Sequence, residues 1–213
     1  MIQATEESIN RLEQALLSLD RIEFKRLMTG RDGNPLPIQE IEAVIVPTLE
    51  RIGSGWEEGR ISLSQVYMSG RLCEELIDAI LPFSDTETTV KPSMAIAALG
   101  DYHLLGTRLV YSVLHSSGFK LLNYGRQDTD ALAEKIKADG ITIMLVSVLM
   151  LNSALHVKDL RTRLNDSGCK VKLVVGGAPF RLDKQLWSEV GADATSNTAA
   201  GAADTVRRLI QEA

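Results

Sequence analysis

The sequence predicts an α/β protein in two parts: a four-helix bundle over residues 1–84 and a five-stranded parallel sheet with flanking helices over residues 93–213. In the first part, apolar residues recur at helical spacing. From residue 93 onward, short apolar runs alternate five times with helical patterns, which is typical of a parallel sheet with right-handed crossovers. Residues 85–92 are polar and include a proline, so we expect an interdomain linker there.

The bundle is predicted from its caps and breaks. Asp20 is a suitable N-cap for the second helix, and Pro47 should bend the third. A glycine-punctuated link follows the third helix, and Trp56 within it is expected to be an aromatic anchor of the bundle core. The expected elements are two short helices within residues 5–29, a loop at 30–37, a third helix over about 38–51, the link at 52–63, and a fourth helix ending near 81.

The second part is predicted to have a flavodoxin-like (Rossmann-like) architecture rather than a six-stranded dinucleotide fold. Its first strand–helix turn lacks the Gly-x-Gly-x-x-Gly spacing of dinucleotide sites, and no Gly-Lys-Ser/Thr of a phosphate-binding loop occurs. The expected strands are 93–99, 119–123, 141–148, 171–175 and 192–195, and the expected helices are 106–117, 129–138, 153–166, 182–190 and 199–212.

The composition excludes several classes of function. A net charge of −5 and a pI near 5.3, without a run of basic residues, argue against a nucleic-acid surface. No stretch approaches the roughly 18 apolar residues of a membrane span, and no secretory signal pattern opens the chain. Cys73 and Cys169 stand alone, without the spacing of a zinc site or disulfide framework. We therefore expect a soluble, cytoplasmic protein.

The first strand–helix turn contains the six-residue motif (hexad) Asp101-x-His103-x-x-Gly106, which is a candidate metal site. A metal-bound histidine usually donates its other ring N–H to a carboxylate, which Asp101 could provide. Gly106 allows the backbone to approach a ligand closely. A capped or solvated Asp-x-His pair is also common in turns, so the hexad alone leaves both interpretations open.

The hexad, followed by Ser147-Val148-Leu149 and Gly176-Gly177, resembles the cobalamin-binding domain of methionine synthase, of B12-dependent mutases and of corrinoid proteins in methyltransferase systems. The resemblance implies that His103 is the lower cobalt ligand, in place of the cofactor's own benzimidazole, and that Asp101 is its hydrogen-bond partner. It implies that Ser147 and the Gly176-Gly177 turn line the channel for the nucleotide tail. The implied cofactor-binding set is Asp101, His103, Leu104, Leu105, Gly106, Ser147, Leu149, Gly176 and Gly177.

The resemblance extends into the helical part. Residues 49–53 and 56–66 look like the helical cap of methyltransferase corrinoid proteins, which in that family shields the methyl group on the upper cobalt face. Two positions depart from the usual Asp-x-His-Asp-Ile-Gly-Lys pattern: Leu104 stands where an acid is usual, and Thr107 where lysine is usual. These changes put polar contacts to the corrin amides in doubt.

As the resemblance implies, the chain is expected to be a non-catalytic methyl carrier that binds cobalamin base-off with histidine on cobalt. The corrinoid would cycle between Co(I) and methyl-Co(III), as methylcobalamin. The implied partners are a substrate-specific methyltransferase, an acceptor methyltransferase using tetrahydrofolate or coenzyme M, and a reductive activator protein, with no nucleic acid or membrane partner. Two alternatives remain open: a cobalamin-dependent sensor, and a lapsed site kept only for protein–protein contact.

Overall fold

The computed structural model describes residues 5–30, 32–80 and 93–212, and the chain divides into two compact units, Met1–Ser84 and Asp85–Ala213. The linker expected over residues 85–92 lies outside the described residues. Each unit is described by itself below. Within the described residues, no helix combines the length and the apolar character that crossing a membrane requires.

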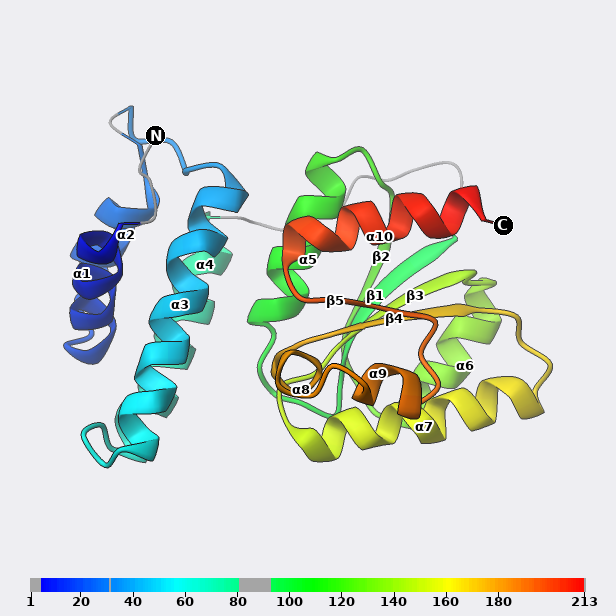
Figure 1. Cartoon of the computed structure of the whole chain (residues 1–213). Coiled ribbons are helices and arrows are strands. Elements are labelled where there is room, and N and C mark those ends of the chain that lie inside the picture. The colour runs from blue at the N-terminus through cyan, green and yellow to red at the C-terminus, as the bar shows by residue number, and fades with distance from the viewer. Residues whose placement is uncertain (1–4, 31, 81–92, 213) are drawn as a thin grey trace. The chain divides into compact units, whose positions relative to one another are not determined.

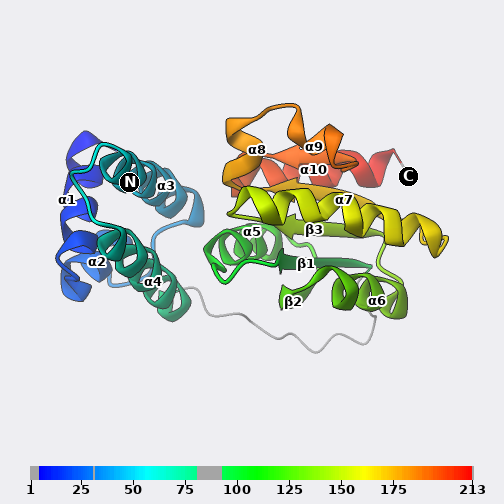
Figure 2. The ribbon, with the colours of Figure 1, turned by 90° about the horizontal axis from the view of Figure 1, so that it is seen from below.

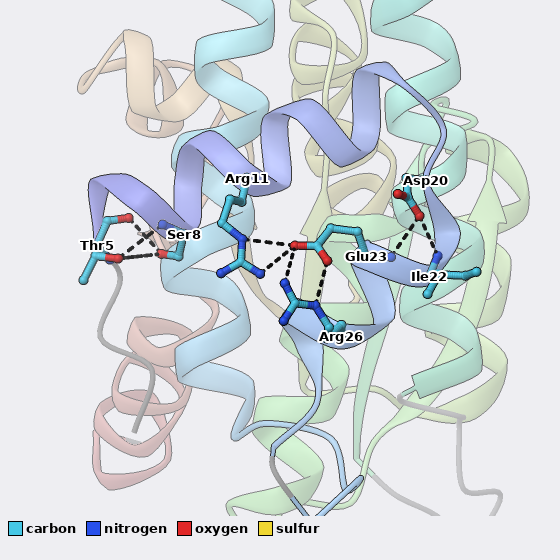
Figure 3. A network of polar contacts seen from close by, with 7 residues as sticks. All are labelled: Thr5, Ser8, Arg11, Asp20, Ile22, Glu23 and Arg26. Carbon is cyan, nitrogen blue, oxygen red and sulfur yellow. Dashed lines mark hydrogen bonds and ion pairs between the residues drawn. The ribbon is translucent and has the colours of Figure 1, made fainter.

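The first unit consists of the helices α1 (Glu6–Leu17), α2 (Arg21–Met28), α3 (Ile38–Glu57) and α4 (Leu63–Ile80), as Figure 1 shows. Local capping fixes the starts of α1 and α2. Thr5 and Ser8 form a capping box at α1, with the Ser8 N–H donating to Thr5 Oγ1 over 3.2 Å (Figure 3). The predicted N-cap Asp20 is confirmed, because its carboxylate accepts from the backbone N–H groups of Ile22 and Glu23.

Helix α3 is longer than the sequence predicts. It was expected to end near Arg51, but it continues through Pro47 and two glycines to Glu57. Gly55 explains part of this extension, since a Cβ there would lie 2.6 Å from Ile61 Cδ1. The absence of a side chain at Gly55 therefore lets the chain that follows α3 pack closely against the helix. A glycine here had been expected to end the helix.

The bundle core is mainly aliphatic, with Phe24 as a buried aromatic residue, and Trp56 does not belong to it. Its exposed fraction is 47%, so the expectation of an aromatic core anchor was wrong. The tryptophan directly follows the buried Gly55 near the end of α3, and its side chain is exposed. The fully buried core side chains include Leu12, Leu16, Phe24, Met28, Ile41, Ile45, Ile52, Cys73 and Ile77.

The second unit is a five-stranded parallel sheet in the order β2-β1-β3-β4-β5, which confirms the predicted fold class. Its strands are β1 (Met94–Leu99), β2 (Leu122–Gln127), β3 (Ile143–Ser147), β4 (Lys172–Gly176) and β5 (Ala194–Ser196). Its helices are α5 (Leu105–Ser116), α6 (Thr129–Asp139), α7 (Leu151–Asp166), α8 (Ala178–Leu182), α9 (Leu186–Glu189) and α10 (Ala199–Gln211).

Two predicted elements differ from the structure. The second strand begins three residues later than expected and extends to Gln127, because Asn123, Tyr124 and Gly125 continue the edge strand despite weak apolar alternation. The helix expected over residues 182–190 is two short helices, α8 and α9. Asp183 separates them in an extended conformation, and its carboxylate accepts from the Gln185 N–H over 2.8 Å.

The sheet has one face covered by α6, α7, α8 and α9, and the other covered by α5 and α10 (Figures 1 and 2). The first face holds a core in which Ala97, Val146 and Val175 pack against Leu132 and Leu160. Because side chains alternate along a strand, the intervening residues point to the face of α5 and α10. The intervening residues include Ser147 and Gly176, which end β3 and β4. Both therefore point to the face of α5 and α10, where a ligand at this edge would meet them.

Candidate functional site

A row of small residues crosses the carboxyl edge of the sheet on the face of α5 and α10. Ala98 of β1 pairs with Ser147 of β3, Ser147 with Gly176 of β4, and Gly176 with Ser196 of β5. Ser147, Gly176 and Ser196 are half-buried, whereas the residues before them in β3 and β4 are buried. The predicted site residues Ser147 and Gly176 are therefore adjacent, in a floor of small residues that solvent reaches. In open α/β sheets, ligands bind at this edge.

Gly106 lies against this floor from the first turn of α5. A Cβ at position 106 would lie 2.7 Å from Ser147 Oγ, so a side chain here would require the serine hydroxyl to move. Gly106 is exposed to solvent, and the Ser147 hydroxyl lies next to it. The hexad glycine thus brings the backbone of α5 close to the end of β3, as well as leaving space beside it.

The Gly176-Gly177 turn is fixed by the backbone of the neighbouring strand. Gly177 has a φ of +124°, and a Cβ there would lie 1.7 Å from the Val148 carbonyl oxygen. A Cβ at Gly176 would lie 3.1 Å from the Ser196 carbonyl oxygen. Val148 also donates its N–H to the Gly176 carbonyl over 3.0 Å. The two glycines therefore hold the turns after β3 and β4 in direct contact.

Asp101 joins the turn after β1 to the turn after β3. Its carboxylate is 5% exposed, and it accepts hydrogen bonds from the Leu149 N–H over 2.5 Å and from the Met150 N–H over 3.4 Å. Met150 is the N-cap residue of α7 and has no capping hydrogen bond from its own side chain. Asp101 thus supplies from another strand the negative charge that suits a helix N-terminus.

Ser153 is a site residue that the sequence reasoning missed. It is 6% exposed, and its hydroxyl donates to the second Asp101 carboxylate oxygen over 2.9 Å. In the sequence it lies in the first turn of α7, 52 residues from its partner. No local pattern marks it, because only the β1–β3 pairing brings the two residues together.

His103, Leu104 and Leu105 lead directly into α5. His103 is half-buried, two residues after Asp101. Leu104 occupies the N-cap position of α5, where it makes no side-chain capping hydrogen bond, and Leu105 is the first helical residue. The position at which the related motif carries an acid is therefore a helix cap, and this chain fills it with an apolar side chain.

Large apolar side chains gather around the same turns and remain exposed. Tyr102 is 73% exposed, and the Arg126 guanidinium lies 3.8 Å from its ring centroid. Leu149 is 42% exposed, and three further apolar residues at the start of α7 are about equally accessible: Met150, Leu151 and Leu155. Exposed apolar surface concentrated at one place marks a binding site. These exposed apolar side chains, next to the half-buried His103, form a candidate binding surface.

Comparison with known proteins agrees with this geometry. Two family models described as B12 binding domains match residues 93–206 and residues 8–81. Monomethylamine corrinoid protein 1 of Methanosarcina mazei is 32% identical over 219 residues, covering 98% of this chain and 100% of that protein. The structure of the Methanosarcina barkeri monomethylamine corrinoid protein matches with a TM-score of 0.79 at 28% identity, covering 96% of this chain and 99% of that chain.

A more distant structure shares the fold. It is the methanol:cobalamin methyltransferase complex of Methanosarcina barkeri, one chain of which matches with a TM-score of 0.53 at 18% identity. The match covers 100% of this chain and 83% of that chain.

Proposed function

We propose, from the premise that the chain belongs to the B12 binding domain family, that it is a corrinoid methyl carrier. It binds cobalamin at the carboxyl edge of the second unit and carries a methyl group between a substrate-specific methyltransferase and an acceptor methyltransferase. When bound, cobalamin supplies the cobalt that takes up and releases the methyl group. The single observation that carries the proposal is the convergence of Asp101, Gly106, Ser147 and Gly177 at one sheet edge, beside the half-buried imidazole of His103.

The residues present fit this cofactor. Gly106 and Gly177 fix the turns at this edge, since a Cβ at either position would meet Ser147 or Val148. Exposed Tyr102 and Leu149 provide apolar area for a macrocycle. One imidazole, from His103, suffices as an axial ligand for a metal already held by a macrocycle.

In this proposal His103 would ligate the cobalt, and Asp101 would accept a hydrogen bond from its other ring nitrogen, which would fix the tautomer and the ring orientation. Asp101 is in turn held by Ser153 and by the backbone at the start of α7. Ser153 and the α7 backbone therefore fix the position of the Asp101 carboxylate, which would in turn orient the imidazole.

The names of the relatives support a proposal for the partners. Their names connect them to monomethylamine, and the more distant fold relative is part of a methanol:cobalamin methyltransferase complex. We infer a methyltransferase partner of the same kind for this chain, a second one for the acceptor, and a reductive activator that restores Co(I). Such chemistry suits the reducing cytoplasm, and Cys73 and Cys169 are free thiols.

The decisive experiment is the visible spectrum and Co(II) EPR of the chain reconstituted with cobalamin, with His103→Ala in parallel. The wild type should bind base-off with a nitrogen hyperfine pattern from one histidine, and the variant should lose that pattern while remaining folded. The Asp101→Asn variant should retain cobalamin with a shifted Co(II)/Co(I) potential. If no corrinoid stays with the wild type through gel filtration, the carrier proposal fails and a lapsed site is favoured.

A further inference from the structure

A buried hydroxyl in the first turn of α5 has no role in the site described above. Thr107 is 1% exposed, and its Oγ1 finds no hydrogen-bond partner among the described residues. Ser69 in α4 of the first unit has the same property, with its Oγ fully buried and without a partner in the described part of the chain. Buried polar groups in folded proteins are nearly always paired, so each such hydroxyl calls for an explanation.

The position of Thr107 connects it with the small-residue floor. It directly follows Gly106, whose backbone approaches Ser147 Oγ, so it lies near the level of the β3 end. Helix α5 packs against β1, β3 and α10, on the sheet face to which Ser147 and Gly176 point. Thr107 is therefore buried beneath α5, on the same side of the sheet and near the same edge as that floor.

We propose that the Thr107 hydroxyl is a hydrogen-bond partner of the nucleotide tail of bound cobalamin. The inference rests on the proposed function, because it assumes that cobalamin binds at this edge. The tail offers phosphate oxygens, ribose hydroxyls and a base nitrogen, and a threonine hydroxyl can donate to or accept from these groups. Binding then pairs a hydroxyl that the protein alone leaves unpaired.

This role also accounts for the residue type. Lysine is usual at this position in the related motif, yet a lysine side chain would bring a charge into a site that is here almost completely buried. Threonine retains a polar atom in a short side chain of fixed rotamers. The chain thus exchanges a long cationic contact for a short neutral one, made close to the α5 backbone.

The test compares two ligands and three variants of the full chain. Thr107→Val replaces the hydroxyl with a methyl group of equal size, Thr107→Ser keeps the hydroxyl, and Ser69→Ala removes the matched orphan hydroxyl of the bundle. Each variant is titrated with cobalamin and with cobinamide, which has the corrin ring and cobalt but lacks the nucleotide tail. Thermal unfolding of the ligand-free variants is measured in parallel.

We expect Thr107→Val to weaken cobalamin binding without lowering the stability of the ligand-free protein. Thr107→Val should leave the ligand-free unfolding temperature unchanged or raise it, because a polar group without a partner is removed. The same change should weaken cobalamin binding about tenfold and leave cobinamide binding unchanged, as loss of one buried hydrogen bond requires. Thr107→Ser should bind cobalamin within a factor of about three of the wild type, and Ser69→Ala should bind both ligands as the wild type does.

Two results would overturn the inference. One is a Thr107→Val variant that binds cobalamin like the wild type. The other is a variant that loses affinity for cobinamide as much as for cobalamin, which would place Thr107 against the corrin or in packing alone. If Thr107→Val does not fold, Thr107→Ser compared with Thr107→Ala decides the same question. A wild-type chain that binds neither ligand refutes the proposed function itself, which keeps the two failures distinct.

Discussion

Gly177 shows how closely one residue can be constrained by a strand that is distant in sequence. Its φ of +124° lies in a region that side chains disfavour, and the Val148 carbonyl occupies the place of its Cβ. The obstacle is backbone, so no rotamer change can relieve it. The role of this glycine at the site is therefore to let two turns touch, and any ligand bound there depends on that contact.

We expect Gly177→Ala to lower the free energy of unfolding of the second unit by more than about 4 kcal/mol, or to prevent its folding. Urea unfolding followed by circular dichroism measures the change. Gly53→Ala is the matched control: it lies inside α3, a Cβ there meets nothing within 4 Å, and it should stabilise by about 0.5–1 kcal/mol. Similar effects of the two substitutions would contradict the steric argument.

Asp101 and Ser153 illustrate the opposite case, in which attraction rather than steric exclusion defines the site. Asp101 was expected to be the hydrogen-bond partner of His103, which stays a prediction, and the structure gives its carboxylate a role at the start of α7. A single carboxylate can accept several hydrogen bonds, so the two duties are compatible. Through this carboxylate, the turn that carries His103 is tied to the exposed apolar residues that follow β3.

At the scale of elements, α5 begins with an unusual cap. Leu104 has a φ of −104° and a ψ of 0° and gives the helix no side-chain acceptor, although the free N–H groups of a helix start call for one. The acid usual at this position in the related motif would provide it. Helix α5 is therefore held by packing on the sheet and on α10 rather than by its cap.

Leu104→Asp should raise the free energy of unfolding by about 0.5–1 kcal/mol at neutral pH, since aspartate both caps the helix and suits its positive end. Leu104→Asn separates these contributions, because it caps without charge, and Leu104→Ala reports the loss of the leucine's packing. Denaturant midpoints of the four proteins provide the measurement. The interpretation fails if Leu104→Asp is no more stable than Leu104→Ala.

The junction of α1 and α2 depends on one carboxylate. Glu23 is held by Arg26 over 2.7 Å and by Arg11 over 2.6 Å (Figure 3). These hydrogen bonds, first from Arg26 and then from Arg11, lower the pKa of Glu23 from 4.5 to about 2. Its folded-state pKa is thus below the unfolded value, so the stability it contributes is present above about pH 4.5 and is lost as the pH falls toward 2.

Glu23→Gln should therefore cost about 1–2 kcal/mol at pH 7, and progressively less as the pH falls from about 4.5 to 2. Unfolding of the full chain, followed by helix signal at several pH values, measures both effects. Glu75→Gln is the control, because Glu75 pairs with Arg21 at an exposed site where ion pairs contribute little. Equal pH dependence in wild type and Glu23→Gln would refute the assignment.

At the scale of the whole molecule, the sheet register decides the site. Pairing of Ser147 with Gly176, and of Gly176 with Ser196, sets three small residues in line. A shift of one residue in β3 would replace Ser147 with a neighbour that points to the opposite face. The position of the site is thus a property of the sheet, shared among four strands.

Cobalamin binding should therefore slow hydrogen exchange in several separated segments at once. At a free ligand concentration about 100 times Kd, we expect protection of roughly 2.7 kcal/mol, about 100-fold in rate, for amides whose exchange requires the site to open. The segments are residues 101–106, 147–151 and 176–177. Residues 129–139 of α6, on the opposite face, serve as the internal reference. Protection confined to one segment would contradict a shared site.

The sequence by itself determined most of the elements and identified the hexad as a candidate site. Apolar periodicity gave four helices and five alternating strands, and Asp20 marked a helix start that the structure confirms. These features are local, because helix and strand patterns and caps depend on residues a few positions apart. Where local signals were ambiguous, as at Gly55 and Asp183, the predicted boundaries were wrong.

Only the tertiary structure decided which residues share the site. Strand pairing brought Ser153 to Asp101 and the end of β3 to Gly106, and packing on the sheet buried Thr107 without a partner. The turn of Gly177 against Val148 and the exposure of Trp56 were decided in the same way. The physical reason is that these facts depend on contacts between segments tens of residues apart, and sequence periodicity contains no information about such distances.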